Sequence, residues 1–219
     1  MPIREDFQRA RSEREKNARR TEILDAAETL LLDSGNERFA VSAVADKVGV
    51  SKSTVFLYFS NKEEMLLMLY TRTGNLLFDR FREKLRPGMS GRDFCEAFVD
   101  CALSNPTMLL LRQMLASTIE RSVSVRSLIE GKREILRYKR TVAEDTERVL
   151  GLTPDKGGQL LQALTNLLAG TAQVDVNGYV DLNLMPDDVA DLIRSGDTRK
   201  SFLEGAEFIF TGATGRPFD

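Results

Sequence analysis

Residues 39–66 read FAVSAVADKVGVSKSTVFLYFSNKEEML, and this stretch has the features of two short helices joined by a tight turn. Val44 and Val48 are one helical turn apart, so both side chains can face a protein core. Gly49 follows them directly and can adopt the left-handed backbone conformation that ends a helix. The stretch therefore predicts a helix-turn-helix hairpin.

The second helix of this hairpin would begin after a cap from Ser51 or Ser53. Val55 would anchor it against the first helix, where the small side chain of Ala45 allows two helices to cross closely. The exposed positions would be Lys52, Ser53, Thr54, Leu57 and Tyr58. This mixture of charged, hydroxyl, apolar and aromatic groups suits contact with DNA. An ordinary helical hairpin with a glycine turn has the same core pattern, so the flanking sequence has to decide.

Composition describes a globular protein of one or two domains, with 219 residues of which 42% are hydrophobic and 29% charged. No apolar run reaches the roughly 18 residues that a membrane span needs. The N-terminus is charged and lacks the apolar stretch of a secretory signal, so we expect a cytoplasmic protein. Cys95 and Cys101 lie in an apolar segment and are expected to be buried free thiols.

The chain contains no histidine. This excludes Ser-His-Asp triads, His–Cys pairs and metal sites built from histidine. The sequence also has neither a glycine-rich phosphate loop nor a cysteine-rich metal motif, and its acidic residues are mixed with basic ones as on solvated helix faces. We therefore expect a protein that is not an enzyme and needs no metal or other cofactor.

The net charge of −2 is unevenly distributed. Residues 1–20 hold seven Lys and Arg against four Asp and Glu, which gives a local charge of +3. Residues 4–20 read as a charged arm or a fraying helix that leads into the first regular helix. This segment is either a solvated tail or an arm whose Arg14, Lys16, Arg19 and Arg20 contact phosphates or a minor groove.

Hydrophobic periodicity predicts an all-α fold, with helices over residues 21–35, 62–85, 91–104, 106–120, 125–150, 157–174 and 198–213. The helix that starts at Lys62 would be capped by Ser60 or Asn61. It would begin beside the hairpin and lead away from it, like a lever. The alternating valines of residues 174–180 are the one stretch that is ambiguous between helix and strand.

The predicted helices 157–174 and 198–213 are apolar around more of their circumference than the others, and each contains an internal glycine. In the second of them, Leu203 and Phe210 would form a second apolar face. A helix that is apolar on two sides is buried on two sides. We expect these two helices and their symmetry mates to form a homodimer interface, although the interior of a monomer would also explain the pattern.

Residues 23–35, ILDAAETLLLDSG, and residues 44–66, VADKVGVSKSTVFLYFSNKEEML, resemble the TetR family of transcriptional regulators. The resemblance is specific over about residues 20–66, and beyond them only the helical character and the length agree. It implies an N-terminal helix-turn-helix DNA-binding domain with a basic arm, residues 1–62. Residues 63–219 would form a C-terminal helical domain for effector binding and dimerisation.

On this basis the expected DNA contacts come from the recognition helix, its surroundings and the arm: Ser42, Ser51, Lys52, Ser53, Thr54, Phe56, Leu57, Tyr58, Lys62, Arg19 and Arg20. Lys62 resembles a phosphate clamp, which its charge and the adjacent helix N-terminus also favour. The chain departs from the family at Phe39 and Ala40, where Thr or Ser is common. It also departs at Phe56, which lacks the hydroxyl of the frequent Tyr.

The resemblance implies a ligand-responsive regulator, most simply a repressor that binds a palindromic operator as a dimer and is released by a small apolar effector. Candidate pocket residues are Phe78, Phe81, Phe94, Phe98, Met108 and Met114, although such residues more often belong to a plain core. One alternative is an effector-independent DNA-binding architectural or assembly protein on the same scaffold. Another is a helical enzyme or carrier whose hairpin never meets DNA.

Overall fold

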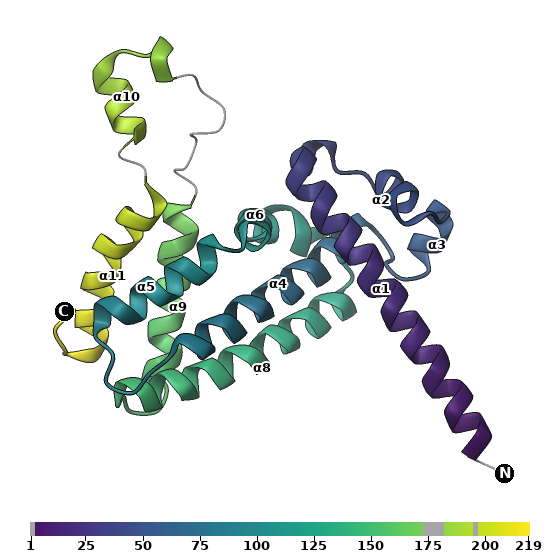
Figure 1. Ribbon diagram of the computed structural model, residues 1–219, viewed down its shortest axis with the longest axis horizontal. Coiled ribbons are helices and arrows are strands. Elements are labelled where there is room, and N and C mark those ends of the chain that lie inside the picture. The colour runs from purple at the N-terminus through teal and green to yellow at the C-terminus, as the bar shows by residue number, and fades with distance from the viewer. Residues whose placement is uncertain (1–2, 173–181, 195–196) are drawn as a thin grey trace.

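The computed structural model describes residues 3–172, 182–194 and 197–219, and every regular element within these ranges is helical. The molecule is elongated, with α1 (Ile3–Arg38), α2 (Val41–Val48) and α3 (Lys52–Phe56) at one end (Figure 1). At the other end lie α5 (Gly91–Leu103), α9 (Lys156–Thr171) and α11 (Thr198–Thr214). Helices α4 (Lys62–Lys84) and α8 (Val125–Leu150) run side by side between the two ends. The predicted all-α class is thereby confirmed.

The elements of the chain, in order, are α1 Ile3–Arg38, α2 Val41–Val48, α3 Lys52–Phe56, α4 Lys62–Lys84, α5 Gly91–Leu103, α6 Pro106–Met114, the π-helical turn η1 Leu115–Ile119, α7 Glu120–Ser122, α8 Val125–Leu150, α9 Lys156–Thr171, the short 3-10 turn η2 Leu182–Leu184, α10 Asp187–Arg194 and α11 Thr198–Thr214.

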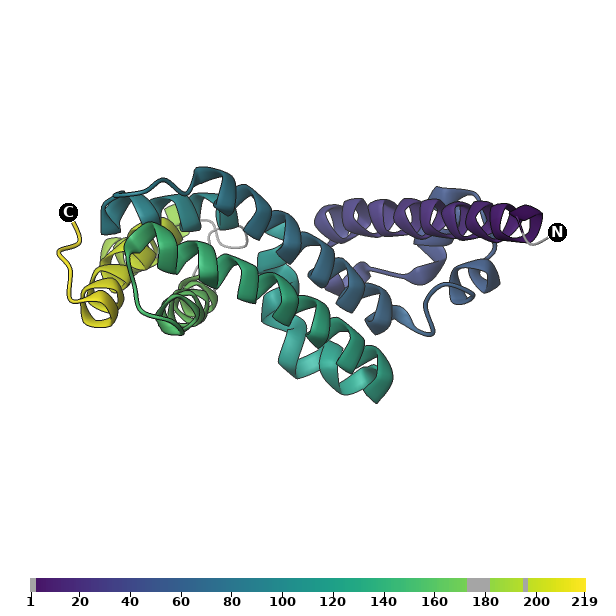
Figure 2. The same cartoon turned by 90° about the horizontal axis from the view of Figure 1, so that it is seen from below.

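Helix α1 is one continuous helix from Ile3 to Arg38, so residues 4–20 are helical and run directly into the helix predicted from Thr21, while the predicted end at Gly35 is wrong. At about 1.5 Å per residue it is roughly 54 Å long. A glycine within a helix costs only about 1 kcal/mol, and Gly35 alone therefore does not end this one. Figure 2 shows the N-terminal part of α1 extending beyond the rest of this end of the molecule.

The helix-turn-helix hairpin has the predicted form. Val44, Ala45 and Val55 are buried, and Gly49 ends α2 in the left-handed conformation with φ 71°. The N-cap of α3 is Ser51, whose hydroxyl accepts a hydrogen bond from the backbone N–H of Thr54. Ser51, and not Ser53, is therefore the cap.

Helix α4 begins and ends as predicted. Asn61 is its N-cap, because its side-chain oxygen accepts a hydrogen bond of 2.7 Å from the backbone N–H of Glu64. Glu63 and Glu64 lie in the first turn, where negative charge favours the helix dipole. The helix continues to Lys84 and connects the two ends of the molecule.

The helix predicted over residues 106–120 is interrupted. Helix α6 ends at Met114, the π-helical turn η1 follows, and α7 continues only to Ser122. Leu115 and Ile119, at the two ends of η1, are both buried. A period of 3.6 residues in the sequence does not reveal such a local change of winding.

Two clusters of buried side chains hold the molecule together. The first joins α5, α9 and α11 to the C-terminal half of α4 and to α8, and contains the edge-to-face contacts of Phe81 with Phe94 and Phe98. The second joins α1, α2, α3 and the start of α4 to α6 and η1. Cys95 and Cys101 are buried free thiols, as predicted, and burial raises the pKa of Cys95 to about 12.

Helices α9 and α11 pack against each other. The backbone approaches closely at Gly205, where a Cβ atom would lie 2.9 Å from the nearest side-chain carbon of Leu167. Phe210 is fully buried within its own chain, so its assignment to a second, outward apolar face is wrong. Phe208, two residues before it and therefore on nearly the opposite side of the helix, is instead 80% exposed.

Two further points concern the C-terminal part. Helix α10 was not predicted from the sequence, and Figure 1 shows it standing apart from the main body. The ambiguous residues 174–180 lie outside the described part of the chain. Among the described helices, none alone combines the length and apolar character needed to cross a membrane, while the bent pair Gly91–Leu103 and Pro106–Ser122 meets these criteria only when joined.

Candidate functional site

The exposed end of the hairpin is formed by α3 and the residues that follow it. Leu57 is 83% exposed and Phe56 is 42% exposed, whereas the neighbouring Val55 is buried and anchors the helix. The ammonium nitrogen of Lys52 lies 5.7 Å from the centroid of the Phe56 ring, so this lysine is held over an aromatic face. Tyr58 is half-buried. Lys52, Phe56 and Leu57 therefore project furthest from the hairpin.

The hydroxyl groups at the start of α3 are engaged with one another. The oxygen of Ser51 lies 2.7 Å from the hydroxyl of Ser53 and 2.8 Å from that of Thr54. It also accepts the backbone N–H of Thr54 at 3.1 Å. These three predicted contact residues therefore form the cap of the recognition helix, and an incoming phosphate would compete with hydrogen bonds already made.

Lys62 lies beside the residue at which the chain departs from the family pattern. Its ammonium nitrogen is 5.3 Å from the centroid of the buried Phe39 ring. Ala40 occupies the N-cap of α2 and provides no side-chain hydrogen bond there. Ser42 is exposed in the first turn of α2. At the position where a Thr or Ser hydroxyl could itself contact DNA, this chain thus has the Phe39 ring, which packs against the cation of Lys62.

The two predicted contacts from α1 have partners within the chain. Arg19 forms an exposed ion pair with Glu22 at 2.7 Å. The guanidinium of Arg20 donates to the carbonyl oxygen of Tyr58 at 3.4 Å and lies 5.8 Å from the centroid of the Phe59 ring. Arg20 therefore holds the segment after α3 against α1.

The start of α4 is hydrogen-bonded to the α7–α8 junction, a connection that no local pattern in the sequence predicts. The side-chain amide of Asn61 donates to the carbonyl oxygen of Ser122 at 2.9 Å. The hydroxyl of Ser127, in the first turn of α8, donates to the carboxylate of Glu64 at 3.0 Å. Burial tends to raise the pKa of Glu64, but hydrogen bonds from Ser60 and Ser127 hold this pKa below its ordinary value.

A second connection joins α1 to α4. The guanidinium of Arg72 pairs with Asp25 at 2.6 Å and with Glu28 at 2.7 Å. Both acids lie on α1, one helical turn apart, so they contact both arms of the same guanidinium fork. Through these pairs and the junction above, the position of α4 is tied to the hairpin on one side and to α8 on the other.

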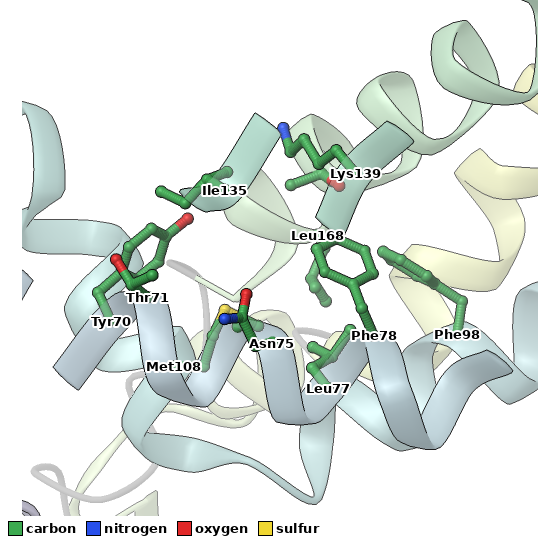
Figure 3. A pocket seen from close by; sticks show the side chains of 12 residues that line it. Tyr70, Thr71, Asn75, Leu77, Phe78, Phe98, Met108, Ile135, Lys139 and Leu168 are labelled. Atoms are coloured by element: carbon green, nitrogen blue, oxygen red, sulfur yellow. The ribbon is translucent and has the colours of Figure 1, made fainter. Parts of the chain in front are cut away.

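Behind α4 lies a narrow, mainly apolar cavity of about 40 Å³, enclosed by α4, α5, α6, α8 and α9. Figure 3 shows Tyr70, Asn75 and Phe78 of α4 across this space from Ile135 and Lys139 of α8. The lining is Tyr70, Thr71, Gly74, Asn75, Leu77, Phe78, Phe98, Met108, Ile135, Lys139, Thr165 and Leu168.

Three of the six candidate pocket residues line this cavity: Phe78, Phe98 and Met108. Phe81 and Phe94 are buried elsewhere in the same core, and Met114 belongs to the core beneath the hairpin. The polar lining residues were missed because each stands alone in an ordinary amphipathic helix, with no motif to single it out.

The polar end of the cavity carries positive charge. Burial and the neighbouring charges of Arg112 and Lys132 lower the pKa of Lys139. The ammonium group of Lys139 donates to the side-chain oxygen of Gln162 at 2.8 Å. Burial raises the pKa of Tyr70, against the opposing influence of Arg112. Arg112 is therefore close enough to both lining residues to act on them electrostatically.

A larger open cleft of about 380 Å³ lies between α1, α4 and α8. It shares Thr71 and Asn75 with the enclosed cavity, so these two residues of α4 separate the inner space from the outer one. Its lining includes Glu64 and Ser127 of the junction described above.

Comparison with known proteins agrees with this architecture. Residues 23–69 match the profile of the bacterial regulatory proteins of the tetR family, and residues 72–176 match the tetracyclin repressor-like C-terminal domain. The chain belongs to the TetR family. Its hairpin is thus the helix-turn-helix of a DNA-binding transcription regulator, and a homodimer in the cytoplasm fits the family.

Two relatives show the range of this TetR-family similarity. A "Fatty acid metabolism regulator protein" from Bacillus subtilis strain 168 is 24% identical over 198 residues, covering 84% of this chain and 97% of that protein. The "HTH-type transcriptional repressor KstR2" from Rhodococcus jostii strain RHA1 is 33% identical over 84 residues, covering 38% of this chain and 41% of that protein. Both are named as regulators of metabolism or transcription, and neither is named as an enzyme.

Among solved structures, the transcriptional regulator FadR from Bacillus subtilis in complex with stearoyl-CoA is similar in fold, with a TM-score of 0.51 and 18% sequence identity. The match covers 84% of this chain and 98% of that chain. The identity is too low to carry over individual residues.

Proposed function

We propose that this TetR-family protein is a ligand-responsive transcriptional repressor that binds a palindromic operator as a homodimer and is released by an effector with a long apolar chain. In this proposal residues 1–62 read DNA, and residues 63–219 bind the effector and form the dimer. The observation that carries it is the arrangement of α4, which begins at the hairpin and lines an apolar cavity along its length.

The proposed DNA surface is centred on Lys52, Phe56 and Leu57, the side chains that project from the hairpin. Lys62 would bind a phosphate at the N-terminus of α4, where backbone N–H groups and the helix dipole also favour an anion. Ser42 and Arg19 are exposed or partly exposed at the margins. Ser51, Ser53, Thr54, Tyr58 and Arg20 would act mainly by shaping the hairpin, since their polar groups already have partners or are half-buried.

The proposed dimer forms through α9 and α11. These helices pack on each other, Phe208 of α11 is exposed, and a Cβ atom at Gly170 of α9 would meet open space, so an outer face of the pair is free to be covered by a partner. Pairing this face with its two-fold mate would bury it in a four-helix arrangement. The two hairpins would then meet half-sites roughly 34 Å apart, or a multiple of that spacing.

An effector with a long apolar chain is supported by two observations. The relatives include a fatty acid metabolism regulator and a regulator solved with stearoyl-CoA. The cavity of this chain is apolar along Leu77, Phe78, Phe98 and Leu168.

The size of the cavity suggests how effector binding would change the position of the helix-turn-helix hairpin. Its volume of about 40 Å³ is well below the roughly 300–1,000 Å³ of typical ligand pockets. A long chain could therefore enter only if α4 and α8 move apart. Such a ligand binds the expanded state better than the closed one, and that difference in affinity is what shifts the hairpins.

The test is to select bound sequences from random DNA with the full chain, and then to add dodecanoyl-CoA to the selected complex. A palindromic consensus and release by the thioester, but not by coenzyme A alone, are expected. Weak binding without sequence preference would overturn the DNA-reading function. A palindromic consensus without release by any apolar compound would favour the effector-independent architectural protein instead.

A further inference from the structure

The side chain of Arg112 contains a buried polar atom without a partner. Its Nε atom is shielded from solvent and has no hydrogen-bond partner within the described part of the chain. A buried N–H donor without a hydrogen bond is costly, because it has lost its hydration and gained no partner. Such an atom is therefore expected where another group completes the site.

Arg112 extends from the face of α6 that borders the cavity. It follows Met108, which lines the cavity, by one turn of α6. Its charge acts on both Tyr70 and Lys139. The hydroxyl of Tyr70 and the ammonium group of Lys139 can both donate hydrogen bonds, as can the Nε of Arg112.

Negative charge near this cluster is limited. None of the described residues that line the cavity is acidic, and the partner of Lys139 is the neutral amide oxygen of Gln162. Glu120 is near enough to raise the pKa of Tyr70, but its carboxylate is paired with Lys132 on α8. The apolar cavity therefore has one cation in its lining, Lys139, and a second, Arg112, on the bordering face of α6, while its described lining contains no acidic residue.

We propose that Arg112 and Lys139, assisted by the hydroxyl of Tyr70, form an anion-binding site at the polar end of the cavity, so that the effector is an aliphatic chain carrying an anionic group. The chain would lie along Leu77, Phe78 and Leu168, and the anion would lie between α6 and α8. This inference rests on the proposed effector function and adds the charge of the ligand and the residues that recognise it.

The anionic group can come from two sources, a free fatty carboxylate or the phosphates of an acyl thioester. Isothermal titration calorimetry of the full chain without DNA, using dodecanoate, dodecanoyl-CoA and the uncharged dodecanol, separates them. At least one charged probe should bind about tenfold or more tightly than dodecanol, because hydrogen bonds to charged groups are the stronger kind. The tighter of the two charged probes identifies the source.

Arg112→Leu and Lys139→Gln should each reduce the affinity for the preferred charged probe by about tenfold while leaving dodecanol binding within about twofold. Arg133→Leu is the matched control, because Arg133 is an exposed cation on α8 outside the cavity lining, and it should bind all three probes like the wild type. Lys139 is only half-buried, so its variant serves if Arg112→Leu fails to fold.

Three results would overturn the proposal: dodecanol binding as tightly as both charged probes, unchanged affinity for the charged probes in both variants, or no binding of any probe by the wild type. Operator release is measured separately. Charge-dependent binding without release would therefore sink the proposed function while leaving the anion site in place.

Discussion

The ammonium nitrogen of Lys62 and the ring of Phe39 are in contact, with 5.3 Å between the nitrogen and the ring centroid. The two residues belong to different segments, one preceding α2 and the other opening α4. The ring restricts the lysine to the edge of the hairpin, and a cation over an aromatic face is stabilised by about 0.5–1 kcal/mol at an exposed site. Phe39 therefore contributes to the proposed DNA surface indirectly.

We expect Lys62→Ala to weaken DNA binding about evenly across sequences and to lower the slope of log affinity against log salt by roughly one unit, since a phosphate contact carries no base information. Phe39→Leu should also weaken DNA binding about evenly across sequences, but by a smaller factor than Lys62→Ala. Fluorescence anisotropy over a salt series measures both. The control is Lys84→Ala, an exposed lysine at the far end of α4. A changed base preference in Lys62→Ala would contradict the clamp role.

Phe208 and Phe210 form a natural pair of test positions on α11. Phe208→Glu should give a folded monomer with much weaker operator binding, because Phe208 is exposed in one chain and would be covered in the dimer. Phe210→Glu should instead unfold the protein, since it places a carboxylate among Phe94 and Phe218. Sedimentation and circular dichroism distinguish the two outcomes. A dimeric Phe208→Glu variant would remove α11 from the proposed interface.

The hydrogen bond from Ser127 to Glu64 is expected to contribute to coupling between effector and operator. Ser127→Ala should lower the factor by which dodecanoyl-CoA weakens operator binding by about twofold to fivefold, which is in the usual range for a residue that couples two sites. Thr141→Ala is the matched control, because its hydroxyl bonds only to the carbonyl of Arg137 within α8. An unchanged factor in Ser127→Ala would show that the junction is only structural.

Lys139 predicts a specific pH dependence of stability. Its pKa is lowered in the folded state, mainly by burial, from an ordinary value of 10.5. Between the lowered pKa and 10.5 the unfolded chain binds more protons, so raising the pH through this window stabilises the folded state. Lys139→Met removes this contribution, and below the window the variant should be the more stable protein.

The measurement is the difference in the free energy of unfolding between wild type and Lys139→Met, from denaturant titrations at a series of alkaline pH values. This difference isolates Lys139 from other groups, such as Cys95, that titrate in the same range. Lys84→Met, at an exposed position, provides the control. A difference that does not change with pH would show that burial does not act on Lys139.

The hairpin could be predicted because its geometry is encoded locally. Gly49 is needed for its backbone conformation, Ser51 for its cap, and Val55 for its position on a helical face. The positions of the helices that follow the hairpin could be predicted for the same reason, since their amphipathic periods are regular. Even so, Gly35 shows that a local signal can be outweighed by the continuity of a helix.

The polar end of the cavity could not be predicted because it is assembled from distant positions. Tyr70, Arg112 and Lys139 come from three helices, and nothing in any one helix marks them as neighbours. The assignment of Phe210 to an outward face was wrong for a related reason. An apolar residue on a second helix face is buried by whatever packs there, and periodicity does not tell a neighbouring helix of the same chain from a partner subunit.

The core beneath the hairpin is completed by Leu111, Leu115 and Ile119, which lie on α6 and η1, far along the chain. A helix-turn-helix hairpin that is fused to another effector domain would therefore expose an apolar surface unless these three residues were transferred with it. Exchange of the N-terminal part between relatives is thus constrained by packing, and recombination within the family should favour crossovers that keep α6 and η1 together with the hairpin.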